Sequence, residues 1–435
     1  MQTILRGIAE KSARQTTHRF QNLINLLTVG FLISCFKYLN KNSAPGVDGV
    51  DPKRYGLNLK QNVEDLVERL KRGRYRAKFI LRRFIPKSGG KLRPLGIPVI
   101  EDKLLQTAVT KILAAIFEPI FLACSFGYRP KVGALDAVKD LSRSLQFNGY
   151  HHIVEADIRG FFDNIRHDKL MEMLSEKIDD KPFLRLIRKW LKAGVLEKGM
   201  VIDPITGTPQ GGIISPMLAN IYLHYALDAW FEEVVKKYCR GRAYLCRYAD
   251  DFVCAFQFQD DAERFYAELE LRLEEFGLSL ATEKTRIVRF SSFHLKDKSS
   301  FDFLGFEFRW SLSRKLKPQV KRRTSRKNLR ESRKKVDEWC RKSRRMKMSL
   351  VLRKFKEKLR GYYNYYGVIG NFKSLAALYY YAVRSLFKWM NRRSQRKSYS
   401  WKGFIELLKI YENPRPRIME QRPMPRLRFQ WRQSV

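Results

Sequence analysis

A pair of acidic residues between two short apolar runs constrains the fold of this 435-residue chain more than any other feature. The runs Ala243–Tyr248 and Phe252–Phe258 flank Ala249-Asp250-Asp251, a pattern typical of a β-hairpin with carboxylates at its tip. An earlier strand-like segment, Ile153–Asp157, also ends at an aspartate. Strands and helices interleave around this hairpin, and that order favours an α+β domain.

Apolar periodicity predicts the surrounding elements. Helical spacing occurs in the chain up to about residue 42 and at 59–72, 101–122, 133–147 and 260–276. Strand-like patterns occur at 79–86, 92–98, 278–290 and 301–310, and a Pro- and Gly-rich loop lies at 43–49. Beyond residue 311 the pattern is helical, basic and rich in aromatic residues, and the tail from residue 411 has little periodicity.

The charge of the chain is large, positive and unevenly distributed. Its 86 Lys and Arg residues against 44 Asp and Glu residues give a formal charge of +42. Residues 311–435 hold 37 basic and 7 acidic residues and so carry +30, whereas residues 1–310 hold 49 and 37. A polyanionic partner relieves repulsion of this size, so we expect a nearly balanced catalytic body followed by a nucleic-acid-binding module.

The cysteines and the longest apolar run bear on metal type and location. The 6 cysteines show no C-x-x-C pair and no Cys/His finger spacing, so we expect neither zinc nor disulfides, and a reducing compartment. The run Leu26–Phe36 is too short to cross a bilayer, and we expect no secretory signal and no membrane partner. The acid-poor segment 1–25 fits an organellar transit peptide or a basic amphipathic helix of the fold, and we favour the helix. The expected location is the bacterial cytoplasm, with an organelle as the alternative.

Three aspartates suit metal-assisted phosphoryl transfer. That chemistry needs carboxylates that converge on two divalent cations, and Mg²⁺ prefers oxygen ligands. Asp157, Asp250 and Asp251 meet at one edge if their strands are neighbours in a sheet. Because side chains alternate along a strand, Asp250 and Asp251 cannot both face the same way without a turn. We therefore expect Asp250 to share both metals with Asp157 and Asp251 to be more peripheral, although each aspartate taken singly could be an ordinary turn residue.

The segment Arg247–Asp251 resembles the Y-A-D-D box of group II intron-encoded reverse transcriptases. Further blocks occur in the order found in that family, namely Ile85–Lys87, Leu92–Pro98, Ser125–Pro130, Asp157–Asp163, Gly207–Gly212, Ser215-Pro216, Ala219-Asn220 and Phe303–Phe306. Beyond them, Arg360–Tyr366 is similar to the maturase (X) region of the family. An ordered series of blocks between about residues 4 and 410 is far more specific than any single tetrapeptide.

The resemblance implies an α+β right-hand polymerase, with fingers and palm, followed by an α-helical thumb/maturase domain. The expected domains are 1–150 for the N-terminal extension and fingers, 151–310 for the palm interleaved with the fingers, 311–410 for the basic thumb/maturase domain, and 411–435 for a basic tail. The implied reaction is RNA-directed DNA polymerisation, in which dNTPs extend a DNA primer on an RNA template. Two Mg²⁺ ions would be held by Asp157, Asp250 and Asp251, and we include Ile158 in the metal set.

The resemblance also implies contacts with the incoming nucleotide. Lys87 and Arg93 would clamp the triphosphate, since developing phosphoryl charge requires cations there. Gln210 would contact the nucleotide or the template, and Lys284 corresponds to a lysine proposed to protonate pyrophosphate. The alternatives are solvated basic residues beside a turn for Lys87 and Arg93, a plain turn around Gln210, and a surface lysine for Lys284.

One aromatic residue after Asp157 is expected to exclude a ribose 2′-OH. Phe162 corresponds to the aromatic residue with this role in related polymerases. Phe161 competes for the role, and either ring could belong to the core instead.

The basic C-terminal region has the composition of an RNA-binding surface. Its Lys and Arg clusters recur at intervals of three to eight residues, which on a helix gives a basic stripe along a phosphate backbone. Its tyrosines could stack on unpaired bases or pack a helical thumb. The expected RNA contacts are Lys321, Arg322, Arg323, Arg326, Lys327, Arg344, Arg345, Tyr362 and Tyr363.

By resemblance, the partners are the group II intron RNA, whose splicing and mobility the protein would assist, an RNA template with a DNA primer, and target DNA. The choice between a monomer and a homodimer stays open. No His or Cys follows residue 390, so we expect the form without the H-N-H endonuclease domain. Two alternatives are a domesticated relative in DNA repair or defence and an RNA-binding maturase with little polymerase role, against which the intact aspartates argue.

Overall fold

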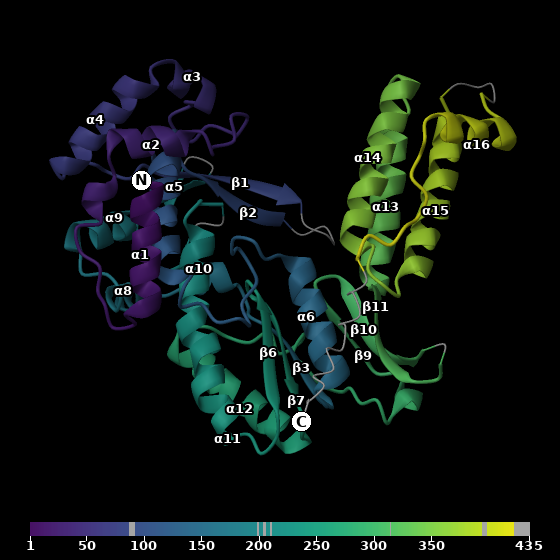
Figure 1. Ribbon diagram of the computed structural model, residues 1–435. Coiled ribbons are helices and arrows are strands. Elements are labelled where there is room, and N and C mark those ends of the chain that lie inside the picture. The colour runs from purple at the N-terminus through teal and green to yellow at the C-terminus, as the bar shows by residue number, and fades with distance from the viewer. Residues whose placement is uncertain are drawn as a thin grey trace, which may run out of the picture. The chain divides into compact units, whose positions relative to one another are not determined.

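The structure is a computed structural model that describes residues 1–86, 92–197, 200–202, 206–208, 211–313, 315–393 and 398–421. The chain divides into two compact units, residues 1–289 and 290–435 (Figure 1). The strands between residues 300 and 324 therefore belong to the same unit as the basic helices. Within the described ranges, no helix has both the length and the apolar character needed to span a membrane.

The first unit begins with helices packed around one mostly buried helix. These elements are α1 (Gln2–Arg14), η1 (Ile24–Leu26), α2 (Val29–Phe36), α3 (Pro52–Leu57), α4 (Leu59–Lys71) and α5 (Ile100–Phe117). Helix α5 lies at the centre, because α1, α2 and the sheet-covering helix α10 (Ser215–Leu223) all contact it. The continuous helical pattern predicted up to residue 42 is wrong between α1 and α2. There the chain pairs with another segment, as Phe20 forms a β-bridge to Ile178, and Thr28 then caps α2.

A small sheet in the first unit has the strand order β2-β1-β4-β5. Its long hairpin consists of β1 (Ile80–Pro86) and β2 (Leu92–Ile97), as predicted, and its short strands are β4 (Val195–Glu197) and β5 (Met200–Ile202). The register pairs Ile85 with Arg93 and Pro86 with Leu92. Arg93 therefore stands near the end of an extended hairpin.

The central sheet of the first unit has the order β6-β7-β3-β8. Its strands are β3 (His152–Asp157), β6 (Ala243–Tyr248), β7 (Asp251–Phe256) and β8 (Arg286–Arg289). The predicted strand 278–290 is thus shorter, because residues 279–281 extend the pairing with β3 and residues 282–285 form a turn. The predicted hairpin with acids at its tip is present as β6 and β7.

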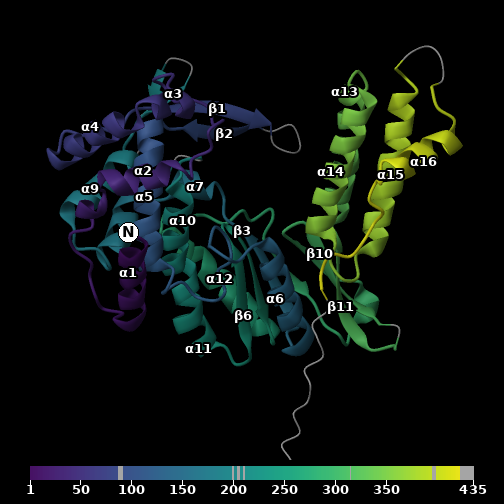
Figure 2. The same ribbon diagram turned by 45° about the horizontal axis from the view of Figure 1, so that its top comes forward.

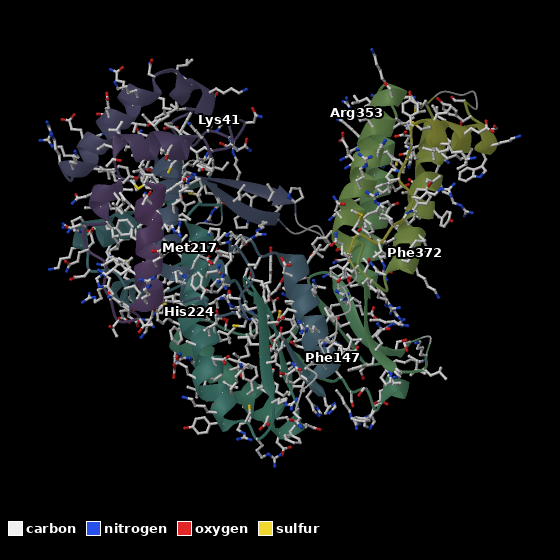
Figure 3. The ribbon with its side chains drawn as sticks, in the orientation of Figure 1. Lys41, Phe147, Met217, His224, Arg353 and Phe372 are labelled. Carbon is white, nitrogen blue, oxygen red and sulfur yellow. The ribbon has the colours of Figure 1, made fainter. Side chains whose placement is uncertain are left out.

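Helices cover both faces of this central sheet (Figures 1 and 2). On one face, Tyr244 and Cys246 of β6 contact α6 (Ala134–Phe147) through hydrogen bonds to Asp140 and to the Ala137 carbonyl. On the other face, α12 (Gln259–Glu275) contacts β3 and β7. The end of α10 and the π-helix η2 (His224–Asp228) that follows it lie on this face too, because they hydrogen-bond Arg247 of β6. Met217 of α10 and His224 of η2 are buried (Figure 3). The remaining elements of the unit are α7 (Phe161–Asn164), α8 (His167–Ser175), α9 (Lys181–Leu191), η3 (Phe231–Val235) and α11 (Lys236–Tyr238).

The second unit combines a small sheet with a helical bundle. Its elements are η4 (Leu295–Asp297), β9 (Ser300–Phe303), β10 (Phe306–Leu312), β11 (Pro318–Thr324), α13 (Arg326–Ser343), α14 (Met348–Tyr366), α15 (Phe372–Met390) and α16 (Trp401–Ile410). The sheet has the order β11-β10-β9, and α13, α14 and α15 lie side by side (Figure 1). The helix expected for Lys321–Arg323 is wrong. These residues lie on β11, where Val320, Arg322 and Thr324 alternate inward with the period of a strand.

Candidate active site

Several distant segments line one pocket of about 510 Å³ in the first unit. Its walls come from β2, the loop after α5, the end of β3 with the start of α7, the β6–β7 turn, and the turn before β8. The lining residues are Leu92, Arg93, Pro94, Tyr128, Asp157, Ile158, Arg159, Gly160, Phe161, Phe162, Tyr248, Ala249, Asp250, Asp251, Ala281, Glu283 and Lys284. The pocket thus collects the three predicted aspartates and part of the predicted nucleotide site.

Asp157 and Asp251 are directly opposite each other in the register of β3 and β7. The amide of Ala281 donates to the Asp157 carbonyl at 2.8 Å, so the main-chain polar groups of Asp157 point toward β8. The pair with Asp251 is therefore a non-hydrogen-bonded one, in which side chains on the same face lie closest together. Two carboxylates consequently project side by side from the sheet.

Asp250 lies in the tight turn of the hairpin. Tyr248 pairs with Asp251, which leaves Ala249 and Asp250 as the two turn residues, and Ala249 has a left-handed φ of 57°. All three carboxylates thus line one pocket. The sequence led us to expect that Asp251 is more peripheral to the metals than Asp250. The register places Asp251 directly opposite Asp157, and the ranking of the two aspartates stays a prediction.

Ile158 can contribute to a metal site only through its main chain. Its side chain is buried, and it forms an antiparallel bridge with Leu280 whose hydrogen bonds are made by the flanking residues. The carbonyl of Ile158 therefore points away from Leu280, toward the side of the strand on which β7 lies. This orientation is the one that a metal-ligating carbonyl beside Asp251 requires.

Lys284 forms an ion pair with Asp157 in this structure. The Lys284 ammonium donates a hydrogen bond to Asp157 Oδ2, and this bond raises the pKa of Lys284 above its ordinary value. Among the described residues, no three acidic, His or Cys side chains are gathered closely enough to hold a metal ion. The donor set nevertheless fits Mg²⁺ in kind, because three carboxylates and one carbonyl supply only oxygen ligands.

Tyr128 is a pocket residue to which the sequence assigned no role. It lies in the Ser125–Pro130 block, is 49% exposed and has a φ of 57°. Burial raises the pKa of its hydroxyl, and the nearby Asp250 raises it further. The exposed Arg93 lines the same pocket, whereas Lys87 and Gln210 lie outside the described residues.

Phe161 and Phe162 are both largely buried at the edge of the pocket. Their exposed fractions are 2% and 7%, and the two rings meet edge-on at 5.4 Å between centroids. Phe161 also contacts Tyr222 of α10, with 6.4 Å between ring centroids. Phe161 is thus packed more deeply, and the role of Phe162 in sugar selection stays a prediction.

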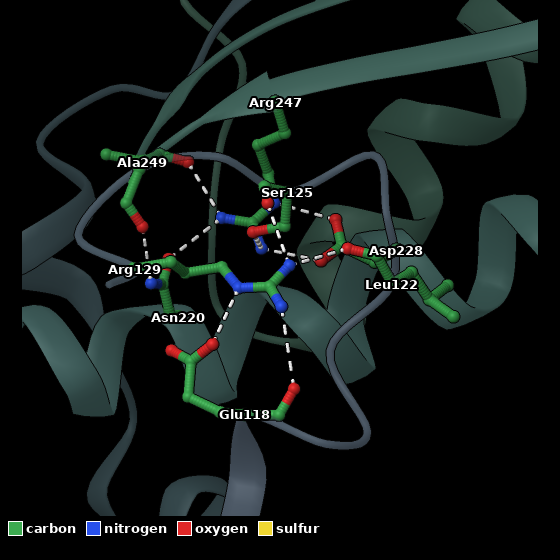
Figure 4. Close-up of polar contacts among 9 residues, drawn as sticks. Glu118, Leu122, Ser125, Arg129, Asn220, Asp228, Arg247 and Ala249 are labelled. Atoms are coloured by element: carbon green, nitrogen blue, oxygen red, sulfur yellow. Dashed lines mark hydrogen bonds and ion pairs between the residues drawn. The ribbon is translucent and has the colours of Figure 1, made fainter. Parts of the chain in front are cut away.

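The aspartate turn rests on a buried arginine. Arg247 is fully buried and hydrogen-bonds Ser125, Asn220, Asp228 and the carbonyl of Ala249 (Figure 4). A Cβ atom at Gly127 would lie 2.2 Å from the Ala249 nitrogen, so only glycine allows this loop to approach the turn.

Several of the RNA contacts expected on the second unit are engaged within the protein. Arg322 is buried and pairs with Glu420 at 2.8 Å, and Arg323 pairs with Glu307 at 2.5 Å. Tyr363 is buried in the helical core, so its expected stacking on RNA is wrong.

The other expected contacts are more accessible. Tyr362 is half-buried and donates to Thr324 Oγ1, and Lys321 donates to the Leu312 carbonyl. Arg344 is half-buried. The exposed members of the expected set are Arg326, Lys327 and Arg345.

A basic groove of about 730 Å³ lies in the second unit and is lined from α13 and α15. Arg333 stands over the ring of Tyr381 at 5.5 Å, and Asp337 accepts hydrogen bonds from Ser385 and Trp389. The lining residues are Arg326, Leu329, Arg330, Arg333, Lys334, Asp337, Glu338, Arg341, Tyr381 and Trp389. Most of its cations belong to the predicted basic clusters, but only Arg326 was expected to contact RNA.

Comparison with known proteins assigns this pocket and this bundle to a family. Residues 85–308 match the family described as reverse transcriptase (RNA-dependent DNA polymerase), and residues 329–404 match the maturase-specific domain of group II introns. The chain belongs to the group II intron-encoded reverse transcriptases. The expected α+β right-hand polymerase followed by a helical thumb/maturase region is thereby confirmed, and enzymes of this family use divalent metal ions.

Individual relatives agree with this family. The group II intron-encoded protein LtrA of Lactococcus lactis subsp. cremoris is 38% identical over 240 residues, which cover 54% of this chain and 39% of LtrA. Protein YkfC of Escherichia coli (strain K12) is 32% identical over 337 residues, covering 69% of this chain and 86% of YkfC. An uncharacterized 91 kDa protein in the cob intron of Schizosaccharomyces pombe is 36% identical over 214 residues. The matched part is thus well under two thirds of LtrA.

Proposed function

We propose that this reverse transcriptase extends a DNA primer on an RNA template, with dNTPs as substrates and two Mg²⁺ ions as cofactors. The observation that carries the proposal is the register that sets Asp157 opposite Asp251, with Asp250 in the adjoining turn and all three in one pocket. An RNA-binding protein without polymerase activity has no need of such an oxygen-ligand set.

The residues of the pocket have different roles in phosphoryl transfer. Asp157, Asp250, Asp251 and the Ile158 carbonyl would hold the metal ions, which supply Lewis-acid stabilisation of the primer 3′-oxygen and the phosphate charge. Arg93, exposed on β2, binds the triphosphate and neutralises its charge. Lys284, once released from Asp157, holds a proton at Nζ that it can donate to the leaving pyrophosphate.

We further propose that the second unit binds the group II intron RNA and so assists splicing and mobility. Support comes from the groove between α13 and α15, where Arg and Lys side chains surround an exposed tyrosine. Cations bind phosphates, and an aromatic ring offers a surface for an unpaired base. The free cysteines agree with our proposal of a reducing compartment, the bacterial cytoplasm. Target DNA and a homodimer stay proposals from the family resemblance.

Primer extension tests the proposal. The purified protein is supplied with a DNA primer annealed to an RNA template, dNTPs and Mg²⁺, and the same primer on a DNA template is run in parallel. We expect full-length DNA on the RNA template and none when EDTA replaces Mg²⁺. Failure to extend any primer on RNA, by protein that still binds the duplex, would contradict the polymerase function.

A further inference from the structure

Arg247 and Asp228 form an ion pair of 2.5 Å in which both side chains are fully buried. Asp228 ends the π-helix η2, and Arg247 is the second residue before the aspartate turn, so the pair joins a helix to the strand that carries the turn. Burial would lower the pKa of Arg247, but the charge and hydrogen bonds of Asp228 outweigh it, so this pKa is raised. Arg247 therefore stays ionised in the interior.

Every N–H donor of the Arg247 guanidinium has a partner (Figure 4). Nε and Nη2 donate to the two oxygens of Asp228 at 2.7 and 2.5 Å. Nη2 also donates to Ser125 Oγ at 2.7 Å. Nη1 donates to Asn220 Oδ1 at 3.2 Å and to the Ala249 carbonyl at 3.1 Å. Only a guanidinium has the five donors that this arrangement uses.

These contacts fix two loops of the pocket against each other. The carbonyl of Ala249 belongs to the left-handed residue that precedes Asp250. On the other side, the main chain of Arg247 pairs with Cys124 and Phe126, and Asn220 donates to the Gly127 carbonyl at 2.7 Å. The loop so held carries Tyr128 into the pocket.

A neighbouring arginine secures the same loop. Arg129 donates to the carbonyls of Leu122 and Ser125, both at 2.9 Å, and pairs with Glu118 at 3.0 Å (Figure 4). The loop is therefore held by side-chain hydrogen bonds on both sides of Gly127.

We propose that Arg247 and Asp228 are positioning residues, which hold the main chain of the aspartate turn and so keep Asp250 and Asp251 in the same pocket as Asp157, where the three can converge on metal ions. A buried ion pair is a weak source of stability, because apolar residues of similar size often replace it without loss. Its contacts to the turn, by contrast, have no apolar substitute. The inference rests on the proposed polymerase function, which supplies the metal ions.

The test separates positioning from stability. The double variant Arg247→Met/Asp228→Leu removes both charges together, and Arg247→Lys keeps the charge but lacks two of the donors. A matched control, Arg69→Met/Glu101→Leu, removes a half-buried ion pair of 2.9 Å between α4 and α5, away from the pocket. Each full-length protein is assayed for melting temperature, Mg²⁺ affinity by calorimetry without nucleic acid, and kcat and KM for dNTP on an RNA template.

We expect the control to melt within a few degrees of the wild type. The double variant should fold but melt lower, because Asn220 Oδ1 and the Ala249 carbonyl lose their donor. In the double variant and in Arg247→Lys, Mg²⁺ affinity and kcat should each fall about 10-fold or more, the usual loss when a supporting contact of a ligand is removed, while KM for dNTP changes little. The control should keep its Mg²⁺ affinity and its kcat.

Wild-type Mg²⁺ affinity in a folded double variant would overturn the inference. If the double variant does not fold, Arg247→Lys decides by the same criterion. Because calorimetry needs no turnover, a wild-type protein that fails to polymerise would contradict the proposed function without deciding the role of Arg247.

Discussion

Asp157 of β3 and Asp251 of β7 face each other across a non-hydrogen-bonded position of the central sheet. Two like charges so close repel each other unless a cation lies between or beside them. In this structure the cation is the ammonium of Lys284, which binds Asp157. The arrangement therefore has a built-in competition between Lys284 and any metal ion at the same carboxylate.

Replacing Lys284 by Met should make metal binding easier. Without the ammonium, Asp157 no longer has to exchange a partner, so the Mg²⁺ concentration for half-maximal rate should fall. Because Lys284 is mostly exposed, the pair is worth little, and we expect a shift of about two- to fivefold. If Lys284 also protonates pyrophosphate, kcat falls at saturating Mg²⁺. A Mg²⁺ titration of primer extension measures both effects, with Lys236→Met as a control, and an unchanged or higher Mg²⁺ requirement would refute the competition.

Phe162 and Phe161 should differ in sugar selection. Steric exclusion by a rigid ring can reject a ribonucleotide, whereas a hydrogen-bonding site tolerates an added hydroxyl. We expect Phe162→Val to admit ribonucleotides much more readily with a smaller loss of dNTP use. Phe161→Val should instead lower stability, by about 1–4 kcal/mol, because Phe161 packs against Tyr222.

For each variant we compare the incorporation of ATP with that of dATP, which measures sugar selection. Urea unfolding curves of the same two variants measure their stability. If only the Phe161 variant accepts ribonucleotides more readily, the ring that excludes the 2′-OH is Phe161 and not Phe162. If neither variant does, the residue that excludes the 2′-OH lies elsewhere in the pocket.

Asp102 should make the first unit less stable as the pH rises. Burial raises the pKa of this carboxyl from 3.8 to about 6, although Tyr75 and the amide of Lys78 donate hydrogen bonds to it. The folded protein therefore binds the proton more tightly than the unfolded chain does. Its free energy of unfolding should fall between about pH 4 and pH 6, by about 3 kcal/mol at 1.36 kcal/mol per pH unit.

The variant Asp102→Asn isolates this effect, because the other carboxylates contribute equally to both proteins. Urea unfolding at a series of pH values should give a stability difference between variant and wild type that grows in favour of the variant up to about pH 6 and then stays constant. A difference independent of pH would show that Asp102 titrates near its ordinary value.

The basic groove of the second unit should contribute directly to the salt dependence of RNA binding. Replacing Arg326, Arg330 and Lys334 by Gln should reduce the slope of log K against log salt by about 2–3, since each phosphate contact contributes about 0.7–0.9. The triple variant Arg353→Gln/Lys402→Gln/Lys409→Gln removes the same charge from other exposed positions of the unit. Equal slopes for the two variants would show that total charge, and not the groove, determines affinity.

The sequence predicted the hairpin and its acids because two independent signals coincide there. Apolar runs give the strands of β6 and β7, and the motif gives the chemistry of Asp250 and Asp251. Contacts between distant residues carry no such signal. Lys284 and Asp157 are 127 residues apart, and only the pairing of residues 279–281 with β3 brings them together.

The wrong predictions about Lys321–Arg323 have one physical cause, which is that the burial of a charge is invisible in composition. Arg322 reads as part of a basic stripe, yet it points into the second unit and meets Glu420 from the C-terminal segment. In the sequence Arg247 is only a basic residue next to the aspartate motif. In the structure its side chain is fully buried and pairs with Asp228. Residues 318–324 contain one aliphatic residue, Val320, so no apolar alternation in the sequence marked this segment as a strand.

Single-turnover nucleotide addition by aspartate variants tests the central claim most directly. Asp157→Asn, Asp250→Asn and Asp251→Asn keep side-chain size and remove one charge each, and Glu283→Gln alters another acid of the same pocket. We expect Asp157→Asn and at least one of the other two to lower the rate on an RNA template by at least about 100-fold, with RNA affinity unchanged and Glu283→Gln near wild type. A near-wild-type rate for Asp157→Asn would contradict the metal site and the account built on it.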